Sequence, residues 1–180
     1  KQKITDYEVS LGKSSGVSTK VRLSEVETLQ YHLDTSFDVN VYIGKKKGHA
    51  SSGDLGKESL IRAIESACLI AKYTQEDPFN GLAPKERLAW QVPELDLYHF
   101  WDLDAKKSID IATECEEAAL QQPEIDNSDG AEISSFEGES IYTNSNGLVA
   151  RAKNTRHSLH CSLIAKRERE MQTAYEYSVA

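Results

Sequence analysis

The sequence predicts an α+β fold, in which two helices pack on one face of a mostly antiparallel β-sheet. Two observations support this prediction. Apolar residues alternate with polar ones near both ends of the chain, and they recur at helical spacing in two segments that lie between these regions. Strands that are followed by helices and then by more strands are typical of α+β folds.

The first 50 residues are predicted to form strands. Alternation runs through residues 16–31, breaks at Ser24 and Glu25, and resumes. Residues 37–43 alternate without a break. The apolar members of these patterns are Val17, Val21, Leu23, Val26, Leu29, Phe37, Val39, Val41 and Ile43. Residues 44–48 are predicted to form a turn and residues 49–52 a further short strand.

The following segments change to helical spacing. Residues 56–75 place apolar side chains at i, i+3, i+4 and i+7, on one face of a helix. Pro78 disfavours helix at the residue before it, so we expect the helix to end before Glu76. After a loop over residues 77–103, a second helix is predicted over residues 105–121, with Asp104 as its N-cap and Pro123 beyond its end.

Strand patterns return in the last third of the chain. They cover residues 131–137, 139–145, 147–165 and 171–180, and Asn146-Gly147 is a strong hairpin signal. We therefore expect an N-terminal β-α-α domain over residues 1–124 and the start of a β-rich region over residues 125–180, joined in one compact unit. The last pattern reaches Ala180 without a terminator, so we expect a further β-rich domain that is absent from this chain.

Composition excludes several classes of function. The chain has 180 residues, a formal charge of −8 and a pI near 5.2, which disfavours nucleic-acid binding. No apolar run is long enough to cross a membrane. Three widely separated cysteines without a C-x-x-C pair indicate packed thiols and a cytoplasmic location. The chain begins with Lys1 and has no signal peptide, so we expect a fragment of a longer protein.

The segment "TRHSLHCSLIA", residues 155–165, concentrates residue types that bind zinc or form nucleophile–base pairs. In a strand, however, alternate side chains point to opposite faces, so His157 and His160 could not share a metal ion. Zinc also requires three or four ligands, and the other histidines occur in unrelated segments. We expect a structural or surface role for this segment, with Cys161 packed on the apolar face.

Three other segments also admit two interpretations. "GKKKGHA" lacks the phosphate-loop pattern and reads better as a solvated hairpin tip. Residues 126–137 resemble a calcium loop, but Gly130 falls at position five rather than six, and an Asx turn entering a strand explains them better. Paired carboxylates among Glu114, Glu116 and Glu117 could do acid–base chemistry if buried, although an exposed acidic run is the more common case.

Taken together, the segments resemble the N-terminal part of the PmbA (TldE) side of the TldD/PmbA family. The resemblance rests on "VNVYIGKKKGHASSGDL", "PELDLYHFWDLD" and "TRHSLHCSLIA", and on residues 21–32, 71–89, 127–138, 143–154 and 171–180. These segments occur in the family's order and cover the chain from about residue 10 to its end. The second and third quoted segments favour the PmbA side over TldD.

The resemblance implies a role without a catalytic residue. In this family a TldD zinc metallopeptidase pairs with PmbA/TldE to cleave unfolded or leader peptides, and the zinc motif belongs to TldD. We therefore expect no cofactor on this chain, zinc on a TldD-type partner, and an extended peptide along strand 154–162. Asn154, Arg156 and His160 are the candidate cleft residues. The alternative is a protein-binding module that modulates a partner such as DNA gyrase.

Overall fold

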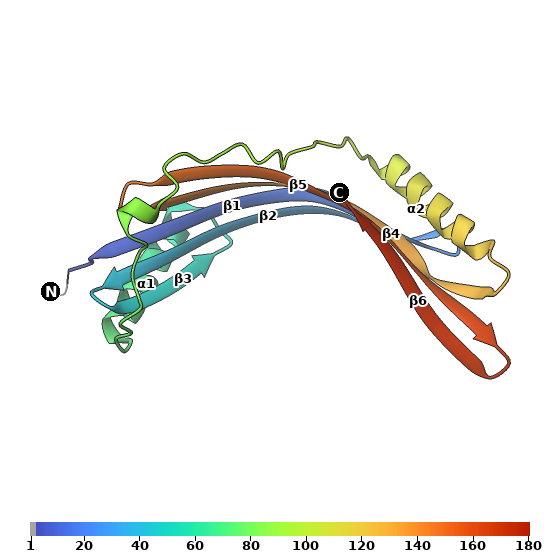
Figure 1. The fold of residues 1–180 in the computed structure, drawn as a ribbon, viewed down its shortest axis with the longest axis horizontal. Helices are drawn as coiled ribbons and strands as arrows, with labels where there is room; N and C mark the ends of the chain where they lie inside the picture. Colours follow the sequence, from blue (N-terminus) through green and yellow to red (C-terminus); the bar gives the residue numbers. More distant parts are fainter. Residues whose placement is uncertain (1–2) are drawn as a thin grey trace. The chain divides into compact units, whose positions relative to one another are not determined.

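The computed structural model describes residues 3–180 and contains six strands and two α-helices (Figure 1). The strands form one sheet in the order β3-β2-β1-β4-β5-β6, so the predicted α+β class is confirmed. The elements are β1 (Asp6–Arg22), β2 (Glu25–Ile43), β3 (Lys46–Ser52), α1 (Lys57–Tyr73), the 3-10 helix η1 (Lys85–Arg87), α2 (Ala105–Leu120), β4 (Ile125–Asn144), β5 (Val149–Arg167) and β6 (Glu170–Val179).

The chain divides into two compact units, and each long strand contributes to both. The first unit comprises residues 3–14, 34–96 and 138–153, and the second comprises residues 15–33, 97–137 and 154–180. The sequence-based boundary between residues 124 and 125 stays a prediction. Of the described helices, none has both the length and the apolar character needed to cross a bilayer.

In the first unit, α1 packs against the hairpin of β2 and β3 (Figure 1). The two strands pair antiparallel from Phe37 opposite Ser52 to Ile43 opposite Lys46. Phe37, Val39 and Val41 of β2 form the apolar core with three alanines of the helix, Ala63, Ala67 and Ala71. The predicted helix is confirmed, and the predicted turn is shorter than expected, because β3 already begins at Lys46.

Gly48 permits the close approach of α1 to β3. A Cβ atom at this position would lie 2.0 Å from the carbonyl oxygen of Ala67 and 2.4 Å from the amide nitrogen of Ala71. Any side chain would therefore collide with helix backbone, which cannot rotate away. Glycine on the strand and alanine on the helix together set the distance between the two elements.

In the second unit, α2 packs on β1 and β4. The helix begins at Ala105 with Asp104 as N-cap, as predicted, and the Asp104 carboxylate accepts a hydrogen bond of 2.7 Å from the Lys107 amide. Ala112 joins a core cluster with five other buried apolar residues, Val17, Val21, Leu103, Ala131 and Ile133. Polar contacts accompany this core, because buried Ser108 and Thr19 join through their hydroxyl oxygens at 2.7 Å.

The turn between β1 and β2 depends on a buried carboxylate. Its central residues Leu23 and Ser24 both have positive φ, 51° and 63°, a conformation that favours glycine or asparagine. The two oxygens of Glu116 accept hydrogen bonds of 2.9 Å from the amides of these residues. The expectation that Glu116 belongs to an exposed acidic run is therefore wrong: Glu114 and Glu117 are exposed, but Glu116 is fully buried because it fastens this turn.

β4 is one continuous strand, although the sequence predicts two shorter ones separated at Glu137-Gly138. It begins at Ile125, so the calcium-like segment lies within it. Gly130 has φ of +110°, and a Cβ atom there would lie 2.7 Å from the carbonyl oxygen of Val21. The glycine therefore serves a close contact between strands and not a metal loop. The predicted hairpin at Asn146-Gly147 is confirmed between β4 and β5.

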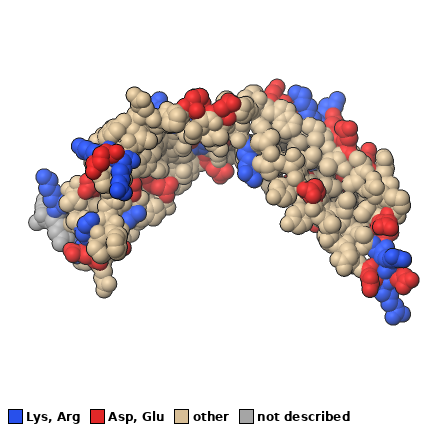
Figure 2. Space-filling model, in the orientation of Figure 1, with Lys and Arg blue, Asp and Glu red and all other residues tan. Residues whose placement is uncertain are grey.

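β5 and β6 form the last hairpin. They pair antiparallel from Ser158 opposite Val179 to Arg167 opposite Glu170, and every residue of β6 is exposed. On the face that Figure 2 shows, Lys and Arg side chains lie beside Asp and Glu at the tip of this hairpin. This mixture matches the sequence of the tip, Lys-Arg-Glu-Arg-Glu over residues 166–170.

Candidate functional site

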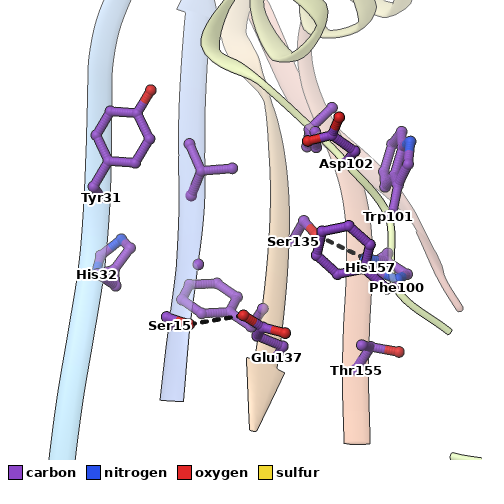
Figure 3. A pocket seen from close by; sticks show the side chains of 14 residues that line it. Ser15, Tyr31, His32, Phe100, Trp101, Asp102, Ser135, Glu137, Thr155 and His157 are labelled. Carbon is purple, nitrogen blue, oxygen red and sulfur yellow. Dashed lines mark hydrogen bonds between the residues drawn. The ribbon is translucent and has the colours of Figure 1, made fainter. Parts of the chain in front are cut away.

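A hollow of about 270 Å³ lies in the second unit (Figure 3). Its walls come from β1, β2, β4 and β5 and from residues 97–103, which we call the strap because they run across the sheet without regular secondary structure. The residues that line it are Ser15, Gly16, Val17, Tyr31, His32, Phe100, Trp101, Asp102, Leu103, Ser135, Phe136, Glu137, Thr155 and His157.

β5 anchors the strap. The Thr155 amide donates a hydrogen bond of 2.8 Å to the carbonyl of Leu97, and the Thr155 hydroxyl accepts one of 2.9 Å from the His99 amide. The Trp101 ring meets the His157 ring edge-on at a centroid distance of 5.4 Å. Buried Leu103 joins the core beneath α2. The strap is therefore fastened to β5 at its start and to the core at its end, with the Trp101 ring held against His157.

His157 connects the sheet to the strap through both ring nitrogens. Nε2 lies 2.9 Å from the carbonyl oxygen of His99, which can only accept, so Nε2 carries the proton of the neutral ring. Nδ1 lies 2.9 Å from the Ser135 hydroxyl and therefore accepts its hydrogen bond. The sequence did not reveal this Ser135–His157 contact, although the alternation of both strands places each residue on the face beneath the strap.

A serine hydroxyl that donates to histidine suggests a nucleophile, but the surroundings favour a structural role. In a serine hydrolase a buried carboxylate orients the imidazole, whereas here a neutral backbone carbonyl takes that place. Ser135 is only 8% exposed. The Ser135–His157 pair therefore fixes the strap instead of activating an alcohol.

The hollow is acidic and aromatic. Glu137 accepts hydrogen bonds from the hydroxyls of Ser15 (3.1 Å) and Tyr98 (3.0 Å), and Asp102 contributes a second carboxylate. Tyr31, Phe100 and Trp101 supply exposed rings. His32 and Phe136 lie with centroids 5.2 Å apart, and Phe136 covers Gly16, where a Cβ atom would lie 2.4 Å from its ring. Such a site suits a flat or cationic group.

The three residues predicted from the sequence to line a peptide cleft lie on β5 but outside this lining. Asn154 and Arg156 are exposed, and the half-buried His160 ring lies 5.9 Å from the Tyr175 ring of β6. Strand alternation turns Arg156 and His160 away from the face that His157 shares with the strap. Their role in a peptide cleft stays a prediction.

The described residues do not fit a metal centre. Among residues 3–180, no three His, Cys, Asp or Glu side chains come together as a possible ligand set. His157 and His160 point to opposite faces of β5, as strand geometry predicts, and both nitrogens of His157 are engaged. Cys161 packs beside Cys115 under α2, and burial raises the pKa of its thiol to about 11, with a smaller contribution from Cys115.

Comparison with known proteins identifies two family domains. Residues 7–71 match the first domain of the PmbA/TldA metallopeptidases, and residues 98–179 match their central domain. The chain is 40% identical over 174 residues to "Metalloprotease PmbA homolog" of Haemophilus influenzae and 36% identical over 173 residues to "Metalloprotease PmbA" of Escherichia coli O157:H7. These alignments cover 96% of the chain but only 39% and 38% of the two relatives.

Solved structures show the same fold at lower identity. A protein from Bacteroides thetaiotaomicron, titled a modulator of DNA gyrase, matches 99% of the chain at 23% identity with a TM-score of 0.87, and the chain covers 41% of it. TldE from Thermococcus kodakarensis matches 97% at 16% identity with a TM-score of 0.72, and the chain covers 40% of it. With both domain matches in the family's order, the chain belongs to the PmbA/TldA metallopeptidase family.

Proposed function

We propose that this chain is the N-terminal part of a PmbA/TldE-type subunit, which is not catalytic by itself. It pairs in the cytoplasm with a zinc-bearing TldD-type subunit, and the pair cleaves unfolded or leader peptides. The 40% identity to a protein named a metalloprotease PmbA homolog, over 96% of the chain, is the observation that supports this most strongly. The likeness in fold to a protein named TldE agrees with it.

The sheet of the second unit offers a physical route to peptide binding. β2 pairs with β3 only from Phe37 to Ile43, and the segment 25–33 borders no other strand among the described residues on its outer side. A free strand edge holds an unfolded peptide through backbone hydrogen bonds, which do not depend on its sequence. The chain could therefore supply a binding surface while a partner supplies the zinc.

Reconstitution tests the proposal. The full-length protein that contains this chain is purified alone and together with a TldD-type protein of the same organism, and cleavage of an unstructured peptide is measured. We expect co-purification, cleavage only by the pair, loss of cleavage with a zinc chelator, and recovery with added zinc. Full activity of the PmbA-type protein alone would contradict the non-catalytic role.

Arg156 tests the predicted cleft on β5. In the reconstituted pair, Arg156→Glu should lower peptide cleavage several-fold, because an exposed positive charge on the proposed peptide path is reversed. Arg151→Glu is the matched control, since Arg151 is an exposed arginine of the same strand at a position of opposite alternation. Unchanged cleavage by the Arg156 variant would remove this strand face from the peptide path.

A regulatory role is the second candidate. Two structures with the same fold, from Thermotoga maritima and Bacteroides thetaiotaomicron, are titled modulators of DNA gyrase. In this case the full-length protein would bind gyrase directly and change its supercoiling rate without any TldD-type partner. A supercoiling assay with the purified protein distinguishes the two roles, because a peptidase subunit should leave the rate unchanged.

A further inference from the structure

The lining of the hollow combines aromatic rings with negative charge. Tyr31 of β2 lies on one side, Phe100 and Trp101 of the strap lie on the other, and Asp102 and Glu137 add two carboxylates (Figure 3). Lys and Arg are absent from the lining residues. Cations bind over the faces of aromatic rings, and neighbouring carboxylates strengthen that preference.

Asp102 is the carboxylate available to a ligand. Its side chain makes no hydrogen bond or ion pair with any residue from 3 to 180, whereas Glu137 is engaged by two neutral hydroxyls. Lys107 of α2 lies nearby, but its ammonium donates to the backbone carbonyl of Asp102 and lies 3.8 Å from the Asp104 carboxylate. That cation therefore already has a carboxylate of its own, and the charge of Asp102 is left without a partner.

The chemistry of the lining favours a planar cation over a compact one. The side chains of Phe100 and Tyr31 are 65% and 73% exposed, so their ring faces are accessible to a ligand. A guanidinium group stacks on aromatic rings and donates two parallel hydrogen bonds to a carboxylate, which an ammonium group cannot do. The arginine side chain is the common biological group with these properties.

The strand edge beside the hollow indicates how such a side chain would arrive. Tyr31 and His32 line the hollow and belong to segment 25–33 of β2, which borders no further strand among residues 3–180. A peptide that pairs with this segment would direct alternate side chains to the face that holds the hollow. The chain's formal charge of −8 also favours a basic ligand.

We propose that the hollow is a binding site for the guanidinium group of an arginine, carried by an extended peptide that lies along segment 25–33 of β2. Phe100, Trp101 and Tyr31 stack on the group, and Asp102 accepts its hydrogen bonds. This goes beyond the proposed function, because the binding belongs to this chain alone. It is measured without a partner, so its failure would leave the two-subunit peptidase standing.

Peptide binding to the full-length protein that contains this chain, purified without a partner, tests the site. The probe is a fluorescein-labelled octapeptide of Gly, Thr and Val with one central Arg, and the matched peptide carries citrulline, which has the same shape without the charge. Fluorescence anisotropy should show about tenfold tighter binding of the Arg peptide, since citrulline loses the cation–π contacts and the charge that strengthens the hydrogen bonds to Asp102. Equal affinities would overturn the proposal.

Variants of the hollow locate the binding. Asp102→Asn and Phe100→Leu should each weaken the Arg peptide about five- to tenfold and leave the citrulline peptide unchanged. The matched controls are Asp110→Asn, an exposed carboxylate on α2, and Phe79→Leu, an exposed phenylalanine of the first unit. Both test positions are exposed, so folding should persist, and thermal melting of each variant checks it. Equal effects at test and control positions would place the peptide elsewhere.

Two further ligands test the peptide part of the proposal. N-methylation of alternate backbone amides in the Arg peptide removes the donors that strand pairing needs, so affinity should fall at least several-fold. Agmatine, which carries a guanidinium without a peptide backbone, should compete only weakly. Competition by agmatine as strong as that by the peptide would overturn binding along the edge of β2.

Discussion

The two helices bury residues at the same spacing, but the buried side chains differ in type. α1 buries Ala63, Ala67 and Ala71, and α2 buries Ser108, Ala112 and Glu116, both at intervals of four residues. The first helix approaches its strands through the smallest side chains and a glycine. The second instead directs a hydroxyl and a carboxylate into the sheet, where β1 and the β1–β2 turn provide partners.

This difference predicts which substitutions should destabilise the packing of each helix. Close packing of backbone against backbone tolerates no added atoms, but it contains no buried polar group that could lose its partner. A hydrogen-bonded contact tolerates small changes of shape, but each lost partner leaves a buried donor or acceptor unsatisfied. The packing of α1 should therefore be sensitive to substitutions that add atoms, and the packing of α2 to substitutions that remove a hydrogen-bonding group.

The largest effect is expected from Glu116→Ala. It removes the acceptor of two amide hydrogen bonds in a turn whose residues have φ of 51° and 63°. Since hydrogen bonds to charged groups contribute more than neutral ones, the free energy of unfolding should fall by about 3–4 kcal/mol. Urea denaturation measures it. Glu114→Ala, at an exposed position of the same helix, should change stability by less than about 0.5 kcal/mol.

A second substitution sharpens this result. Leu23→Asn with Ser24→Gly introduces residues that favour positive φ in this turn, so the pair should recover part of the stability lost in the Glu116→Ala protein. If the two changes stabilise the native and the Glu116→Ala proteins equally, then Glu116 does not act by holding the turn.

Gly48→Ala should produce the next largest loss of stability, in this case because it adds a Cβ atom. The new Cβ would lie 2.0 Å from the Ala67 carbonyl oxygen, so α1 must move away from β3. Overpacking of this kind costs about 2–3 kcal/mol. Gly53→Ala is the matched control, because its Cβ would be 3.6 Å from the nearest atom, the Thr35 carbonyl oxygen. Similar melting temperatures for both variants would contradict the close approach of α1.

The Thr19–Ser108 contact should give a smaller effect with a characteristic asymmetry. Ser108 donates its proton to the Ala105 carbonyl at 2.8 Å, so Thr19 is the donor in the 2.7 Å contact between the hydroxyls. Ser108→Ala leaves the buried Thr19 hydroxyl without an acceptor and should lower the free energy of unfolding by about 2 kcal/mol, whereas Thr19→Val should lower it by about 1 kcal/mol. In a double-mutant cycle, the combined change should cost less than the sum. Strict additivity would mean that the hydroxyls do not interact.

Much of the fold follows from periodicity alone, and the exceptions have physical causes. Alternation predicted the strands, Asn146-Gly147 predicted the hairpin between β4 and β5, and helical spacing predicted both helices, with Asp104 as the cap of the second. The burial of Glu116 was missed because a helix pattern does not show which backbone amides a distant turn leaves free. The break predicted within β4 was wrong because a Glu-Gly pair can continue a strand when neighbouring strands hold it on both sides.

The candidate site was harder to predict. Strand alternation separated His157 from His160, but the partners of His157, Ser135 and His99, are 22 and 58 residues away. The strap was predicted as the end of a loop over residues 77–103, and nothing local indicates which strands it crosses. A useful signal was present in residues 97–103, where three aromatic residues and a histidine precede a helix cap. Buried polar contacts of long sequence separation cannot be read from local patterns.

Alkylation of Cys161 requires no substitution and tests how tightly α2 covers β5. Cys161 lies beneath this helix beside Cys115, and burial raises the pKa of its thiol from the ordinary 9.0 to about 11. Only the thiolate reacts with iodoacetamide, so at pH 8 the reactive fraction should be about 100-fold lower in the folded protein than in the unfolded chain. Peptide mass spectrometry after timed alkylation follows Cys161 separately from the other cysteines.

The pH dependence of this reaction gives the sign of the effect. Because the folded thiol keeps its proton up to about pH 11, its alkylation rate should continue to rise between pH 9 and 11, whereas the rate in urea should level off near pH 9. The same difference means that the thiol opposes folding in this window, since the unfolded state releases its proton first. A folded-state rate that levels off as early as the rate in urea would show that α2 does not bury this thiol. The contact between α2 and β5 would then be open to solvent at Cys161.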